Sequence, residues 1–281
     1  MKSLKILSAL VAFILILNAC TERIDIKLDD TYTRLVVEGA ISTDTTRHIV
    51  KLTKTSSYFA NEEPPAVSGA IVKISDGTQE WTLTENPQKP GVYETSPLVY
   101  GVPGKTYTLT IRNVDIDNNG QTEEYTASSL LQPINSIDSI RTEYRTDYDA
   151  WEIKLYTYDS PMEDHYLFNL YKNNVLQTDT ITEPLIVNDK LFNGNYTNGI
   201  GVAWLRDEKT GEKGNVGDHV LLEIWGITKD YYNFISDIGQ ETSGSNPMFS
   251  GPPANIRGNV NNGAFGFFAA YSISRASGVL K

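Results

Sequence analysis

This chain of 281 residues lacks a second cysteine, so Cys20 is its only thiol. An intramolecular disulfide is therefore excluded, and buried cores must supply the stability of the fold. Histidine is also scarce: His48, His165 and His219 lie far apart, and none has a second ligand at the spacing typical of zinc sites. No Gly-x-Ser-x-Gly sequence occurs, and the scattered Ser, His and Asp residues do not define a triad. We therefore predict a protein without a metal site, a cofactor or enzymatic activity.

The chain also lacks an apolar run long enough to cross a membrane as a helix. Residues 6–17 are almost wholly apolar, but a helix of that length extends over only about 18 Å. The hydrocarbon core of a bilayer is about 30 Å thick. Two lysines precede the run, and a small residue, Ala19, follows it directly before Cys20. These features predict a cleaved export signal over residues 1–19.

Cys20 lies where a lipid anchor would be attached. Leu17, Ala19 and Cys20 resemble positions −3, −1 and +1 of a bacterial lipobox, although Asn18 is less usual at −2. The resemblance implies a diacylglycerol on the sulfur, cleavage after Ala19 and acylation of the new amine. Several acyl chains anchor a protein stably, because each buried methylene adds about 0.8 kcal/mol. We predict a lipidated cysteine and a polar tether over 20–30, and an ordinary signal peptide stays the alternative.

Basic residues are outnumbered, 24 against 35 acidic ones. Removal of residues 1–19 takes away two lysines and no acidic residue, so 22 basic and 35 acidic residues leave a net charge of −13. Such a surface repels nucleic acids and anionic lipid headgroups, so we predict no nucleic-acid partner. Solubility of an envelope protein is sufficient to explain the excess.

Alternation of apolar and polar residues dominates residues 31–131. In 106–112, Tyr107, Leu109 and Ile111 point to one side and threonines to the other, which predicts a half-buried strand. Turn pairs at 76–77, 90–91, 103–104 and 119–120 separate similar segments. The other predicted strands are 34–41, 48–54, 70–75, 79–84 and 93–96. Many short strands with frequent turns predict a β-sandwich domain.

Residues 132–281 form a second predicted domain, which is β-rich and has one short helix. Strands are expected at 151–155, 165–171, 220–227 and 264–273, whereas the Asn- and Gly-rich stretch 188–217 predicts a loop that contains Trp204. The period changes once, because residues 231, 234, 235 and 238 share one face of a helix near 229–239. Thr228 can cap the start of this helix, and Gly239 is placed to end it.

One acidic segment resembles a calcium loop. Asp115, Asp117 and Asn119 occupy positions 1, 3 and 5 of that pattern. Thr126 stands where the pattern has a bidentate glutamate, and predicted strands flank the segment. An acidic hairpin tip is the preferred interpretation, and calcium binding there stays open.

Three tryptophans could form a platform on which a sugar stacks. Trp151 and Trp225 lie in alternating segments and fit core positions equally well. Trp204, in the predicted loop, is the better candidate for an exposed contact.

Several segments together resemble one known family, the domain of unknown function 4249 family. The segments are 20–25, 35–39, 67–72, 91–93, 104–109, 231–232, 246–247, Pro252-Pro253-Ala254-Asn255-Ile256-Arg257-Gly258-Asn259 and Asn262-Gly263-Ala264-Phe265-Gly266. The resemblance implies a lipoprotein of the Bacteroidota, often encoded near TonB-dependent outer-membrane transporters. It also implies that the first half is an immunoglobulin-like or carboxypeptidase-regulatory-like sandwich. The family has no established catalytic residues.

These features together predict a lipid-anchored binding or accessory protein of the outer membrane. We expect it to work with a TonB-dependent transporter in nutrient uptake, on either the periplasmic or the outer face. Its small-molecule or glycan ligand is not predicted. The alternatives are a surface structural or adhesive lipoprotein and a hydrolase with an unrecognised site.

Overall fold

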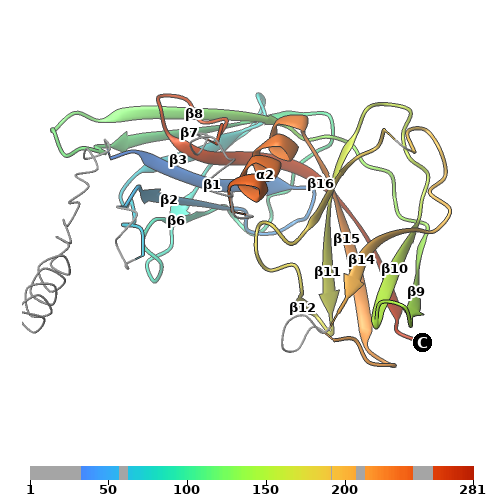
Figure 1. Ribbon diagram of the computed structural model, residues 1–281. Coiled ribbons are helices and arrows are strands. Elements are labelled where there is room, and N and C mark those ends of the chain that lie inside the picture. The colour runs from blue at the N-terminus through green and yellow to red at the C-terminus, as the bar shows by residue number, and fades with distance from the viewer. Residues whose placement is uncertain (1–32, 57–62, 191, 207–212, 243–255) are drawn as a thin grey trace, which may run out of the picture. The chain divides into compact units, whose positions relative to one another are not determined.

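The computed structural model describes residues 33–56, 63–190, 192–206, 213–242 and 256–281, and Figure 1 shows their arrangement. The predicted signal over 1–19 and the tether over 20–30 lie outside the described residues. Thr33–Lys281 form one compact unit. The described part of this unit is mainly strand with a single helix, which confirms the predicted fold class.

The elements follow one another along the chain in a fixed order. They are β1 (Leu35–Ser42), β2 (Ile49–Lys54), β3 (Ile71–Ser75), β4 (Glu80–Thr82), β5 (Thr84–Glu85), β6 (Val92–Glu94), β7 (Thr106–Val114), β8 (Glu123–Leu130), β9 (Ser139–Arg145), β10 (Ala150–Tyr156), β11 (His165–Lys172), β12 (Val175–Leu176), β13 (Leu185–Asn188), β14 (Ile200–Leu205), β15 (His219–Ile227), α2 (Lys229–Thr242) and β16 (Phe265–Val279). Among the described residues these strands form sheets of nine, four and three strands.

A sandwich encloses the core of the N-terminal half. Its four-stranded sheet has the order β4-β3-β7-β8 and packs against β1, β2 and the first part of β16. In β7 the side chains of Tyr107, Leu109 and Ile111 are fully buried, whereas the intervening threonines are partly exposed. The predicted alternation is therefore confirmed, and burial of one face of each sheet supplies the hydrophobic stabilisation.

The last strand, β16, belongs to both halves of the chain. Residues 265–271 pair in parallel with β1, and residues 272–279 pair antiparallel with β15. Figure 1 shows this strand in red, running from beside β1 to beside β15. Phe268 and Ala270 therefore complete the core of the N-terminal sandwich. One sheet therefore continues through both halves. The predicted domain division at 131–132 stays a prediction.

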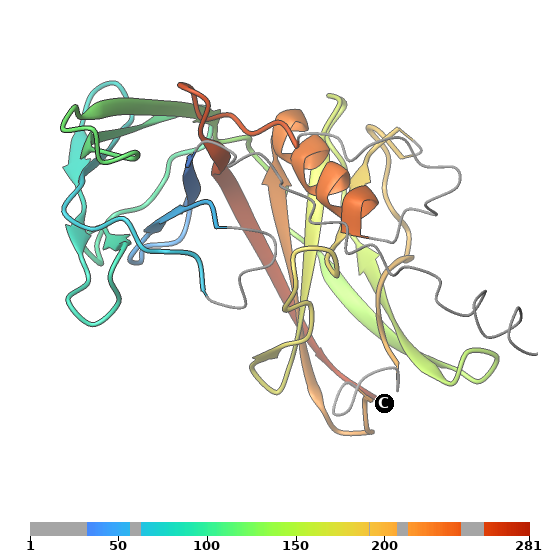
Figure 2. The same cartoon turned by 60° about the vertical axis from the view of Figure 1, so that its left-hand side comes forward.

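The C-terminal half is built around β11 and β15. One face of these strands packs against the three-stranded sheet β14-β10-β9, where Tyr166, Phe168 and Leu155 share a core. The opposite face carries Leu167 and Ile227, on which Ile235 of α2 packs. Figure 2 shows the helix in orange beside the strands of this half. Because both faces are covered, the side chains of β11 are buried continuously from His165 to Leu170.

Two local predictions for this half are wrong. Residues 188–217 are not one loop, because β14 lies within them and contains Trp204, paired with Glu152 of β10. Gly239 does not end the helix, which continues to Thr242; Gly239 is absent from the glycines with positive φ, the conformation that ends many helices. The start is as predicted, because the Thr228 hydroxyl accepts the N–H of Tyr231 at 3.2 Å.

Candidate functional site

The predicted attachment site, Cys20, lies outside the described residues. Across the residues that the structure describes, no helix has both the length and the apolar character that a membrane span requires. Lipid attachment therefore stays a prediction from the sequence.

The acidic segment forms the tip of the hairpin between β7 and β8, as the preferred interpretation predicts. Its side chains form hydrogen bonds within the loop. Asp115 accepts the N–H groups of Asn119 and Gly120 at 3.0 and 2.9 Å, and Asp117 accepts the side-chain amide of Asn119 at 2.8 Å. The only acidic group in the described residues with the mutual spacing of metal ligands lies elsewhere, in the C-terminal half.

The structure does not bring the three histidines into one cluster within its described part. Burial lowers the pKa of His48, whose Nε2 lies 3.1 Å from the Val99 carbonyl oxygen. His165 faces α2, with its ring 5.0 Å from that of Tyr232, and burial lowers its pKa as well. His219 donates its backbone N–H to Asn173. Each histidine thus contacts a different part of the molecule.

The three tryptophans do not form a platform. Trp151 is buried, and its Nε1–H donates to the Gly214 carbonyl at 3.1 Å. Trp204 is half-buried; its ring meets that of Tyr148 edge-on at 5.5 Å, and the guanidinium of Arg206 lies over it at 5.3 Å. Trp225 stacks on Tyr271 instead.

An aromatic groove runs beside α2, and β1, β15 and β16 contribute to its walls. Trp225 of β15 and Tyr271 of β16 stack with ring centroids 4.0 Å apart and nearly parallel planes. Phe267 of β16 lies 5.0 Å from Tyr231 and 5.1 Å from Phe234, which are both on α2. The space between these rings and β1 measures about 680 Å³. We call this feature the aromatic groove.

The chemistry of the aromatic groove suits binding better than proton transfer. Burial raises the pKa of Tyr231 to about 12 and also raises that of Tyr271, so both phenols stay neutral near pH 7. Among the described residues that line the aromatic groove, Glu38 is the only ionisable side chain other than tyrosine. Rings of this kind present flat apolar faces and edges to a ligand. The helical period of 231, 234 and 238 predicted three of these positions, but nothing local placed β16 beside them.

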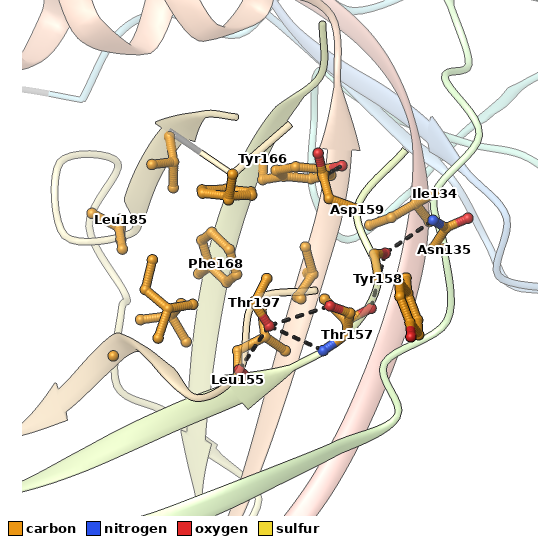
Figure 3. A pocket seen from close by; sticks show the side chains of 16 residues that line it. Ile134, Asn135, Leu155, Thr157, Tyr158, Asp159, Tyr166, Phe168, Leu185 and Thr197 are labelled. Carbon is orange, nitrogen blue, oxygen red and sulfur yellow. Dashed lines mark hydrogen bonds between the residues drawn. The ribbon is translucent and has the colours of Figure 1, made fainter. Parts of the chain in front are cut away.

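A smaller cavity of about 120 Å³ lies between β10, β11 and β14, and Figure 3 shows its lining. Leu155, Phe168 and Leu185 make its walls apolar. At one end the Tyr166 hydroxyl donates to Asp159 Oδ1 at 2.6 Å. Burial raises the pKa of Asp159. The pKa of Tyr166 is raised mainly by burial and also by its hydrogen bond to Asp159. On the opposite wall, the Thr197 hydroxyl donates to the Leu155 carbonyl oxygen at 2.9 Å.

Sequence reasoning missed the acidic end of this cavity. Asp164 directly precedes β11 and Asp189 directly follows β13, which pairs with β11. Carboxylates at the facing ends of two paired strands would have been a usable signal, but β13 was not predicted as a strand, and Asp189 lay in the predicted loop 188–217. Because β13 has no clear alternation of apolar and polar residues, its pairing with β11 was not predicted.

The fold defines the class of the protein: it is mainly β, and β16 joins the strands of both halves in one nine-stranded sheet. The chain belongs to the family described as Domain of unknown function (DUF4249), which matches residues 21–277. The family predicted from the sequence is therefore confirmed. No curated protein matches the chain.

The segment that resembles the family most specifically has a structural role. Asn259 accepts the N–H of Phe268 at 2.9 Å and donates to the Phe268 carbonyl at 2.8 Å, which holds the start of β16. Gly266 has φ of 92°, and a Cβ there would lie 2.0 Å from the Val37 carbonyl oxygen. The segment therefore docks β16 onto β1.

Proposed function

We propose that this protein is a lipid-anchored accessory protein of the outer membrane that binds a ligand without transforming it. The observation that carries the proposal is the lipobox-like sequence Leu17-Asn18-Ala19-Cys20, which ends a run too short to span a bilayer. The family supports a partner as well, because the resemblance implies a TonB-dependent transporter. In this role the accessory protein captures a nutrient and the transporter then carries it across the outer membrane.

The aromatic groove supports the binding role. Its volume of about 680 Å³ falls within the range of about 300–1,000 Å³ typical of small-molecule sites. Phe267 and Tyr271 stand on the part of β16 that pairs with β1, and this pairing holds their backbone in place. Preorganised rings bind flat apolar groups with little loss of conformational freedom. The ligand class that fits is a molecule with a ring or another flat apolar face.

The anchor is tested by a pair of matched variants. Cys20→Ser removes the sulfur that would carry the lipid, whereas Thr21→Ser makes an equally small change one residue later. We expect the wild type and Thr21→Ser in the membrane fraction and Cys20→Ser to leave it. Mass spectrometry of the processed N-terminus should find a lipid-modified thioether. An intact leader or a free sulfhydryl on released protein would contradict the proposal.

The partner is tested by affinity purification in mild detergent. A β-barrel transporter should be recovered with the wild type and lost with Cys20→Ser, because an unanchored protein is diluted away from the membrane. Failure to recover such a transporter under any growth condition would contradict the partnership. If deletion instead reduced attachment to surfaces and left growth on limiting nutrients unchanged, an adhesive role would replace the transport role.

A further inference from the structure

Three aspartates meet beside the acidic end of the cavity, and we call them the aspartate triad: Asp159, Asp164 and Asp189. The antiparallel register that pairs His165 with Asn188 continues to Asp164 and Asp189. The Asp189 N–H donates to the Asp164 carbonyl at 3.2 Å, and the Asp164 N–H donates to Asp189 Oδ2 at 2.9 Å. Asp159 joins them from the segment between β10 and β11. One carboxylate oxygen of each lies within 4.8 Å of those of the other two.

Two members of the aspartate triad are buried and Asp164 is half-buried. Asp189 is 0% exposed and Asp159 is 8% exposed. Within the described ranges no lysine, arginine or histidine forms an ion pair with any of the three. Like charges at this spacing repel strongly where water is excluded, because the local dielectric constant is low. A buried cluster of carboxylates is therefore normally paired with a cation or a metal ion.

The donors that do reach the aspartate triad are few and neutral. The Tyr166 hydroxyl donates to Asp159 Oδ1 and the Gly194 N–H to Asp159 Oδ2, at 2.6 and 3.1 Å. The Ser160 hydroxyl donates to Asp164 Oδ2 at 2.5 Å. These bonds orient the carboxylates but do not neutralise their charge. In metal sites, hydrogen bonds from neighbouring groups orient the ligands in the same way.

One oxygen of the aspartate triad has no hydrogen-bond partner. Asp189 Oδ1 is buried and accepts no donor, although the other oxygen of the same carboxylate accepts the Asp164 N–H. A buried carboxylate oxygen without a donor is rare and costly in a folded protein. The Asp189 carboxylate lies beside two further carboxylates, so a cation placed among the three could contact it.

We propose that the aspartate triad binds a calcium ion. All three side-chain ligands are oxygens, and hard cations prefer such ligands, whereas zinc and copper prefer histidine or cysteine. Calcium accepts irregular geometry and six to eight oxygens, but magnesium requires a nearly ideal octahedron. The ligands come from two strand ends and a loop, so irregular geometry is expected. The ion would tie the segment after β10 to the ends of β11 and β13 and so hold the cavity wall at Tyr166.

Terbium, a luminescent substitute for calcium, provides the direct test on the detergent-solubilised full chain after treatment with EDTA. Tyr166 contacts Asp159, so it should sensitise terbium emission, and calcium should displace the terbium. We expect a dissociation constant for calcium on the order of 10⁻⁴ to 10⁻³ M, as in extracellular modules. Asp189→Asn, which preserves shape and removes charge, should weaken calcium binding at least about 10-fold. The matched control Asp117→Asn, at the hairpin tip, should leave binding unchanged.

Circular dichroism shows whether Asp189→Asn is folded, and Asp164→Asn, at a less buried position, repeats the test if it is not. An increase of the wild-type unfolding temperature with calcium provides a measurement that needs no variant. The proposal is overturned if calcium neither displaces terbium nor raises this temperature. It is also overturned if Asp117→Asn is the variant that loses binding, or if magnesium competes at the same concentration as calcium.

Discussion

We expect replacement of Arg275 to weaken the contact between the two halves of the chain. It lies on β16, and its Nε donates to Glu223 of β15 at 2.6 Å. Its two terminal nitrogens donate to both carboxylate oxygens of Asp44, which follows β1, at 2.8 and 2.5 Å. The side chain of Glu223 is 5% exposed, whereas those of Asp44 and Arg275 are 37% and 38% exposed.

The size of the effect follows from this difference in exposure. In Arg275→Leu the buried Glu223 carboxylate loses its ion-pair partner and retains the Trp225 Nε1–H, which donates at 2.5 Å. Loss of one partner of a buried ion pair costs about 3–5 kcal/mol. Because water reaches Arg275, we expect a smaller loss of unfolding free energy, about 2–4 kcal/mol. Asp44→Asn breaks only the exposed arm and should cost about 0–1 kcal/mol.

Urea denaturation followed by circular dichroism measures both losses. The midpoint should fall for Arg275→Leu with an unchanged slope, because the surface exposed on unfolding is the same. In the double variant Arg275→Leu and Glu223→Leu most of the stability should return, since no buried charge is left unpaired. A loss for Arg275→Leu no larger than that for Asp44→Asn would refute the reasoning. So would a double variant that is less stable than Arg275→Leu alone.

Two further predictions concern the sandwich. Gly266→Ala should prevent the pairing of β16 with β1, because its methyl group would lie 2.0 Å from the Val37 carbonyl oxygen. The control Gly263→Ala, also at positive φ but with open space around it, should cost only about 1–2 kcal/mol, and equal melting temperatures would contradict this. The Lys105 ammonium holds the pKa of Asp76 at about 2, below its ordinary 3.8. The stability that this pair contributes is therefore complete above about pH 4 and is lost as the pH falls toward 2. The urea midpoint should fall less over that range in Asp76→Asn than in the wild type, and parallel curves would count against the pair.

Much of the fold was predictable, because period and turn chemistry are local properties. The alternation in 106–112 placed Tyr107 and Leu109 in the core, where both are fully buried. The glycines of all four predicted turn pairs, Gly77, Gly91, Gly104 and Gly120, have positive φ. The shared face of residues 231, 234 and 235 located the helix, although not its end at Thr242.

The errors occur where distant pairing overrides local preference. Asn and Gly are frequent around β14, yet the strand forms because β10 offers a complementary edge and a core position for Val202. The same limit applies to the candidate sites. No spacing along the chain relates Asp159 to Asp189, and only the register of β11 with β13 brings their carboxylates together.

By itself the sequence determined that this chain is mainly β, to which family it belongs, where its helix starts and which residue is predicted to carry a lipid. Those conclusions follow from neighbours in the chain, whose spacing sets period, capping and motif. The tertiary structure alone decided that β16 joins both halves in one sheet, that an aromatic groove lies beside α2 and that three aspartates meet. Such features depend on which strands find each other, and that choice is set by burial summed over the whole molecule.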